Sequence, residues 1–154
     1  MDNMELGTRF LFEMRLYAKR VDELGNLPKG KTQFVLGKSG IVKGPHLNGI
    51  VLEGATAVVS TRPDGVQQSD VRLVIKTDDD ALILMSYFGR RHGSEAVMSQ
   101  ISNGENPQAH EYYFRTVPTF ETAVSKYSWL NKIVAVGIGR RLPDGLNYRV
   151  FEVL

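Results

Sequence analysis

Apolar and polar side chains alternate along much of this chain, and the alternation predicts strands. Phe10, Phe12, Met14 and Leu16 share one parity, while charged residues occupy much of the other. Because alternate side chains of a strand point to opposite faces, this run predicts a long first strand. Good helix formers between residues 5 and 20 leave a helix as the competing interpretation, which the apolar even positions disfavour.

Shorter runs of the same kind follow, separated by glycine and proline. A polar connection is predicted at 22–31, a short strand at 32–36, and a loop with one brief extended piece at 38–45. Glycines at 49 and 54 punctuate the β-branched run 47–61, which is typical of a strand that bends. After an Arg-Pro-Asp-Gly turn, a strand ending at Lys76 is apolar on one face and charged on the other, and 81–88 is its hairpin partner.

The stretch 111–139 concentrates aromatic and charged residues between two strand-like runs. In the first run, Tyr113 and Arg115 share one face, and Tyr112 and Phe114 share the other. Pro118 restricts that strand to an edge or an ending. In the second run, three residues of one parity lead into a β-branched segment at 133–136, namely Tyr127, Trp129 and Asn131.

The segment 90–110 is long and irregular, with a possible short helix at 94–102. Such a segment is either a lid over a binding site or a mobile connection. A last strand is predicted at 146–153, after a second Pro-Asp-Gly turn. The total is about eight to ten strands, which favours an all-β barrel or sandwich.

Four motifs occur in order along nearly the whole chain. They are GPHLNG (44–49), TRPDG (61–65), TDDDALI (77–83), and YFRTVPTFET (113–122) followed by KYSWLN (126–131). With these motifs the chain resembles the family called domain of unknown function 3237, or uncharacterised protein family 0311. The resemblance implies a single-domain antiparallel β-barrel over residues 1–154, with an interior pocket for a small organic ligand.

One departure from the family concerns that pocket. After GPHLNG the family usually carries an Asp-Trp pair where this chain has Ala57 and Val58. If the family's pair lines the pocket, this chain has a smaller and less polar wall there.

Size and composition favour one soluble domain. The 154 residues suit a single core, and the net charge of +2 is too small to suggest a nucleic-acid surface. No cysteine is present, so disulfides and thiolate metal sites are excluded. Without a long apolar run, we expect no membrane partner and a cytoplasmic location.

No cofactor or metal is expected from the sequence. The glycines do not form a phosphate loop, and the three histidines lie far apart. Asp78, Asp79 and Asp80 are conceivable metal ligands, but one hairpin turn supplies too few oxygens for calcium and its acids are usually solvated.

Acid, base and aromatic residues form the better candidate site. We expect catalytic roles for Glu121, Arg115, Tyr113 and Asp70, and substrate-binding roles for Arg72, Tyr127, Trp129 and Asn131. A carboxylate buried against an aromatic ring has a raised pKa suited to proton transfer, and an arginine can hold a substrate carboxylate or an enolate oxygen. The competing interpretation is that the charges only pair with one another and the aromatics only pack.

These residues leave three classes of function open. The first is a cofactor-independent isomerase, cyclase or lyase acting on a small carbonyl-bearing or aromatic molecule. The second is a non-catalytic binding or carrier barrel for such a molecule. The third is a structural barrel that forms oligomers, and a homodimer or higher homo-oligomer is possible in every case.

Overall fold

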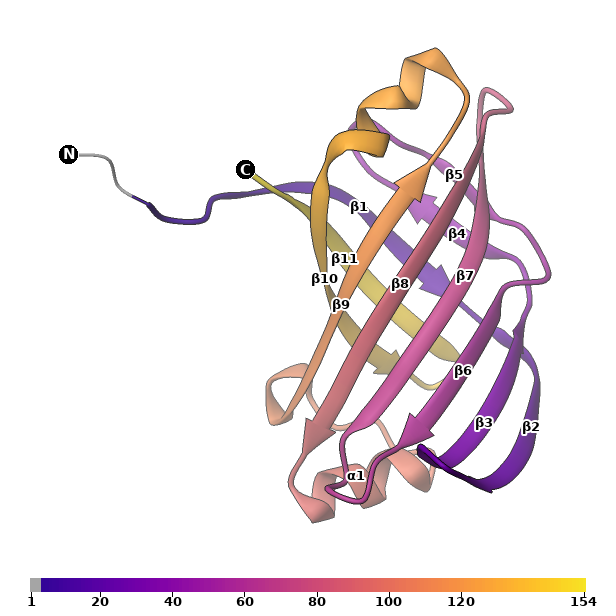
Figure 1. The fold of residues 1–154 in the computed structure, drawn as a ribbon, viewed down its shortest axis with the longest axis vertical. Coiled ribbons are helices and arrows are strands. Elements are labelled where there is room, and N and C mark those ends of the chain that lie inside the picture. The colour runs from indigo at the N-terminus through magenta and orange to yellow at the C-terminus, as the bar shows by residue number, and fades with distance from the viewer. Residues whose placement is uncertain (1–3) are drawn as a thin grey trace.

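Eleven antiparallel strands form the structure, which is a computed structural model describing residues 4–154 (Figure 1). The strands are β1 (Thr8–Leu16), β2 (Ala18–Leu27), β3 (Gly30–Gly37), β4 (Gly40–Lys43), β5 (Gly49–Val51), β6 (Thr56–Thr61), β7 (Gln67–Thr77), β8 (Leu82–Gly93), β9 (Tyr112–Glu121), β10 (Val134–Leu142) and β11 (Gly145–Val153). Three short helical segments accompany them: α1 (Glu95–Ser102), η1 (Ala109–Glu111) and η2 (Ser125–Lys132).

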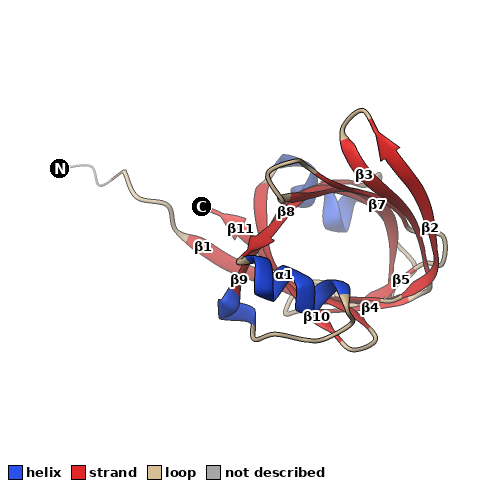
Figure 2. Ribbon diagram, turned by 90° about the horizontal axis from the view of Figure 1, so that it is seen from below, coloured by secondary structure: helices blue, strands red, loops and turns tan. Residues whose placement is uncertain are grey.

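Eight of the strands close into a barrel, which confirms the predicted fold class. The circuit runs β7-β8-β9-β10-β11-β1-β4-β5 and returns to β7. Closure pairs every barrel strand on both sides and so removes the exposed edges of an open sheet. Figure 2 shows the ring of strands from one end, with α1 at that end.

Along one of its edges, strand β7 pairs with two different strands, and this division widens one end of the barrel. Residues 75–77 of β7 pair with β5, whereas residues 67–72 pair with β6. Beyond β6 lie β3 and then β2. Together β6, β3 and β2 form a three-stranded flap at the lower end in Figure 1. The wall therefore splays outward at that end and leaves space inside.

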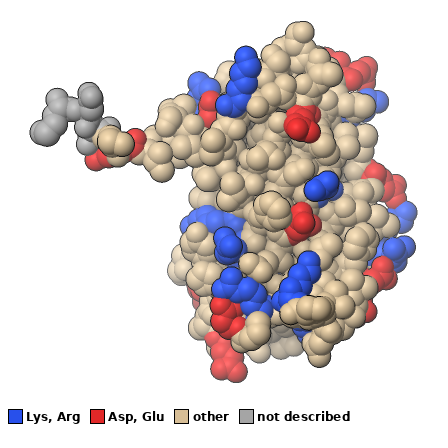
Figure 3. Space-filling model, in the orientation of Figure 1, with Lys and Arg blue, Asp and Glu red and all other residues tan. Residues whose placement is uncertain are grey.

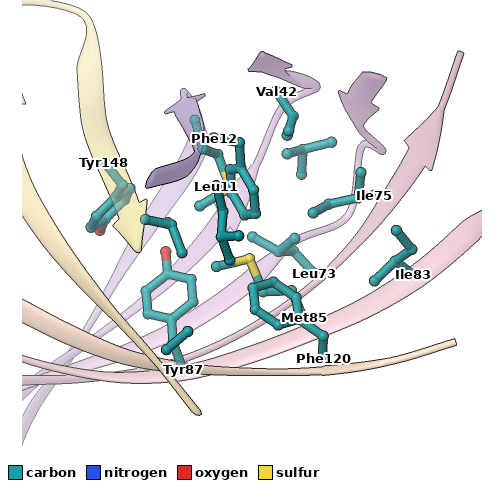
Figure 4. Close-up of a cluster of buried hydrophobic side chains, with 14 of the residues drawn as sticks. Leu11, Phe12, Val42, Leu73, Ile75, Ile83, Met85, Tyr87, Phe120 and Tyr148 are labelled. Carbon is teal, nitrogen blue, oxygen red and sulfur yellow. The ribbon is translucent and has the colours of Figure 1, made fainter. Parts of the chain in front are cut away.

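The other half of the barrel is filled with apolar side chains. Phe12 is completely buried, and its ring meets the Phe120 ring edge-on at 5.9 Å between centroids (Figure 4). The β1–β11 register shifts between Phe10 and Phe12, a bulge that turns Leu11 into the core as well. This half of the barrel is thus a packed core, and the space lies at the flap end.

Two local predictions are wrong, and the edge position predicted for Pro118 is found. The predicted connection at 22–31 is mostly strand β2, which pairs with β3 despite its polar sequence. The run containing Tyr127 forms the 3₁₀ segment η2 instead of a strand, and β10 begins only at Val134. Strand β9 continues through Pro118 to Glu121, because there it pairs with β8, whereas its pairing with β10 covers only Arg115 and Thr116. A proline is tolerated where the strand has lost one neighbour.

The predicted helix in the segment 90–110 is confirmed. Helix α1 begins after Ser94, whose hydroxyl accepts a hydrogen bond from the Val97 N–H at 3.2 Å. No helix within residues 4–154 is long and apolar enough to cross a membrane.

Candidate functional site

A pocket of about 420 Å³ lies inside the splayed end of the barrel. Its apolar wall comes from the flap, where Val21, Val35 and Val59 face inward. Its opposite wall comes from β8, β9 and the β10–β11 hairpin, with Tyr87, Phe114 and Tyr148 among the lining side chains. This size and this mixture of apolar and polar groups suit a small organic molecule.

Two buried tyrosines stand together on the pocket wall. Tyr87 is 3% exposed and Tyr148 is 2% exposed, and their rings meet edge-on with centroids 5.4 Å apart. Figure 4 shows both phenols beside the apolar core. Burial raises the pKa of Tyr148 to about 12, although Tyr87 and Arg91 nearby act in the opposite direction. Burial likewise raises the pKa of Tyr87, so both phenols are neutral proton donors near pH 7.

Arg91 reaches the same space from β8. Its Nε donates to Gln67 Oε1 at 2.8 Å, and its guanidinium lies over the Phe114 ring, 5.3 Å from the centroid. Burial lowers the pKa of Arg91, but an arginine stays charged at neutral pH. No carboxylate in residues 4–154 lies within 4.0 Å of this guanidinium. The site therefore holds a positive charge that no acid of the described chain neutralises by direct contact.

A glycine and a third tyrosine set the position of these groups. A Cβ on Gly139 would lie 2.8 Å from the Phe114 ring, so only glycine leaves this ring its place beneath Arg91. The Tyr112 hydroxyl accepts a hydrogen bond from the backbone N–H of Arg141 at 2.8 Å. This bond anchors the end of β10 where Arg141 enters the pocket lining.

The buried phenols give the fold a pH dependence. Tyrosines of the unfolded chain lose their protons near pH 10, whereas Tyr148 in the fold keeps its proton to about pH 12. Its contribution to stability is complete below pH 10 and is lost as the pH rises toward 12, because the native state then holds more protons than the unfolded chain. In urea titrations from pH 9.5 to 11.5, Tyr148→Phe should lose less stability than the wild type. The exposed Tyr113→Phe should keep the wild-type slope, and equal slopes for all three proteins would contradict the assignment.

Comparison with known proteins identifies the family of this barrel. The family model described as "Protein of unknown function (DUF3237)" matches residues 6–153. The chain belongs to this family.

Relatives of this DUF3237 protein include both uncharacterised proteins and an enzyme. A UPF0311 protein of Clostridium acetobutylicum is 34% identical over 124 residues, covering 80% of this chain and 78% of that protein. The crystal structure of a conserved protein of unknown function from Rhodopseudomonas palustris superposes with a TM-score of 0.94 at 28% identity, over 99% of this chain and 100% of that one. A hydroalkoxylation enzyme of Penicillium herquei is 29% identical over 108 residues, which are 70% of this chain and 54% of the enzyme. This DUF3237 barrel is thus distantly related to an enzyme of small-molecule chemistry.

Of the two positions expected from the sequence to depart from the family, Ala57 and Val58, one lies at the pocket. Ala57 lines the pocket, whereas Val58 faces outward on the next position of β6. The small Ala57 side chain leaves this wall of the DUF3237 pocket apolar.

Most of the residues predicted for the site lie outside the barrel. The inner face of β9 carries Tyr112 and Phe114, so Tyr113 and Arg115 point outward and are exposed. With Asp70 they line a depression of about 350 Å³ on the outer surface, where the Arg115 guanidinium lies 5.0 Å from the centroid of the Tyr113 ring. Arg72 and Glu121 are exposed as well. On the face shown in Figure 3, Lys and Arg side chains stand closest together over the lower half.

The remaining three predicted residues lie at the opposite end from the pocket. The Tyr127 hydroxyl donates to Asp79 Oδ1 at 2.7 Å and so joins η2 to the β7–β8 turn. Asn131 accepts from the Thr122 N–H at 2.8 Å and donates to the Thr122 carbonyl at 2.9 Å. Trp129 is half-buried and packs against the core. These contacts hold the connection between β9 and β10 in place.

The residues that build the pocket carry a signal in the sequence of β8. Inward positions of β8 are the odd ones, from Ile83 through Tyr87, and the same parity continues to Arg91.

Within residues 4–154, no three His, Cys, Asp or Glu side chains gather closely enough to hold a metal ion.

Proposed function

We propose that this DUF3237 barrel binds a small, largely apolar molecule with a carbonyl or phenol oxygen in its pocket and converts it by acid–base chemistry without a cofactor. One observation carries the proposal: the Tyr87–Tyr148 pair, neutral and buried, shares the pocket wall with the positive Arg91. A carrier of apolar molecules has no need of such a group of proton donors.

The tyrosine pair supplies a proton at the pocket surface. In the addition of an O–H group across a C=C bond, the oxygen bonds to one alkene carbon and the other alkene carbon gains a proton. A phenol of the pair gives that proton, and the resulting phenolate takes up the proton lost by the attacking oxygen. No electrons are exchanged and the pair ends as it began, so the reaction is an isomerisation by ring closure when both groups belong to one substrate.

Arg91 supports this chemistry against the effect of burial. Arg91 lies close enough to Tyr148 to oppose the rise of its pKa, so its charge stabilises a transient phenolate. Beside two buried phenols such a fixed charge acts more strongly than in bulk water. The relationship to the hydroalkoxylation enzyme of Penicillium herquei supports the same reaction class, because that name describes addition of an O–H group to a C=C bond.

Native mass spectrometry of the purified protein, followed by denaturation and identification of any released compound, tests whether the pocket holds a ligand. We expect a phenol or carbonyl compound, or its cyclised product. A second assay incubates the protein with alkenyl phenols such as 2-prenylphenol and follows ring closure by NMR, since the product has the mass of the substrate. The carrier would be favoured instead if the retained compound is recovered unchanged and none of the alkenyl phenols is converted.

A further inference from the structure

The pocket adjoins a second and larger hollow, and two arginines lie at the boundary between them. A groove of about 1270 Å³ runs between α1, the turn after β6 and the flap. Pocket and groove share five lining residues, and this boundary is called the neck: Gln33, Val59, Gln67, Arg91 and Arg141. A ligand that enters the pocket from the groove passes both guanidinium groups.

Neither arginine of the neck has an acidic partner within residues 4–154. The Nε of Arg141 is buried and has no hydrogen-bond partner in this part of the chain. Four acids line the pocket or the groove, namely Glu23, Asp64, Glu95 and Asp144, and none of them lies within 4.0 Å of either guanidinium. The two positive charges thus remain available to an incoming anion.

The two guanidiniums also act on each other. Arg141 lies near enough to lower the pKa of Arg91, in addition to the larger effect of burial. Two neighbouring cations with restricted access to water are unfavourable unless an anion joins them. Their N–H groups form planar forks that match the two oxygens of a carboxylate.

We propose that Arg91 and Arg141 bind the carboxylate of an apolar, preferably aromatic, monocarboxylic acid. The apolar part of this acid lies in the pocket between the flap valines and Phe114. The inference rests on the proposed function of the pocket as a small-molecule site and adds to it the substrate class and its orientation. The carboxylate stays at the neck, and the apolar part extends toward Tyr87 and Tyr148, whose neutral phenols provide no second anion site.

Isothermal titration calorimetry with matched acid and amide pairs tests this assignment. The pairs are benzoate and benzamide, cinnamate and cinnamamide, and 1-naphthoate and 1-naphthamide. For the best pair we expect the wild-type protein to bind the acid at least about tenfold more tightly than the amide, with an affinity that falls as salt is added. Arg91→Met and Arg141→Met should each reduce this acid preference severalfold.

Two matched controls come from the neighbouring positions of the same strands. Arg90 and Arg140 are exposed, point away from the pocket, and lose the same charge on substitution. Arg90→Met and Arg140→Met should therefore keep the wild-type preference. Arg91→Lys and Arg141→Lys serve if either methionine variant fails to fold, because they keep the charge and lose the planar fork. Each should then show a reduced acid preference.

The outcomes separate this inference from the proposed function. The double variant Tyr87→Phe/Tyr148→Phe should keep the acid preference even though turnover is lost. Acid preference without turnover of any compound would support the arginine site and count against the enzyme. Any of three results overturns the inference. The wild type could bind acids and amides equally, it could bind no acid up to millimolar concentrations, or both neck variants could keep the wild-type preference.

Discussion

Replacing Phe12 with alanine is expected to lower the free energy of unfolding by about 3–5 kcal/mol. The Phe12 side chain is completely inaccessible to solvent and packs edge-on against Phe120 from the far side of the barrel. A closed barrel cannot easily collapse around the missing ring, because hydrogen bonds on both sides fix each strand. Urea denaturation monitored by circular dichroism, with the slope compared between variants, measures the loss.

A control for this prediction lies two residues earlier on the same strand. Phe10 meets Phe151 edge-on with centroids 5.7 Å apart, but it is only partly buried and lies outside the main core. Phe10→Ala removes the same group from the same strand and should cost less than half as much. Equal losses in the two variants would contradict the view that the barrel half around Phe12 is the main source of stability.

Alternation along the chain is sufficient to predict the barrel wall where one face is apolar. In β7, Val71, Leu73 and Ile75 are buried as their parity predicts. Strand β1 shows the limit of this method, because its bulge brings both Leu11 and Phe12 inward and a strict period of two cannot describe that. Strand β2 shows another limit, since it is polar on both faces and owes its structure to pairing with β3.

The choice of face on β9 decides where the candidate site lies. Phe114 and Phe120 share the inward face, whereas Arg115 and Glu121 share the outward one, so alternation along the strand already favours the arrangement found. The neighbouring strand adds a second signal, because Gly137 and Gly139 of β10 provide the space that inward Thr116 and Phe114 require. That second signal is a pairing between distant segments.

The position of Arg91 near the end of β8 is harder to predict from the local pattern. An arginine at an inward position interrupts the apolar parity, so the periodic pattern ends before Arg91 although the strand continues to Gly93. A charged side chain is tolerated there because Arg91 lies beside Gln67 of β7 and Phe114 of β9, its partners on the two neighbouring strands. Site residues break the pattern that builds the fold, and this makes them hard to find from periodicity.

The second prediction with a large effect concerns the tyrosine pair. Tyr148→Phe is expected to lower kcat by about 10²–10⁴-fold, the range typical of a positioned proton donor. Tyr87→Phe should have a comparable effect, because its ring lies edge-on to Tyr148 and both phenols occupy the same wall. If the two hydroxyls act as one unit, the double variant is about as impaired as the worse single variant and the effects do not multiply.

Three variants on the outer surface make this result decisive. Tyr113→Phe removes the same kind of hydroxyl from an exposed ring. Arg115→Ala and Glu121→Gln remove groups that the sequence predicts to be catalytic and that lie on the outer surface. With the compound identified by mass spectrometry as substrate, all three should keep near-wild-type kcat, and every variant should show a thermal midpoint that confirms folding. Activity that survives in the double tyrosine variant but disappears with Arg115 or Glu121 would move the reaction to the outer face. Loss confined to the tyrosine variants places the proton donor inside the barrel, where an apolar substrate meets a charge and two neutral phenols away from bulk water.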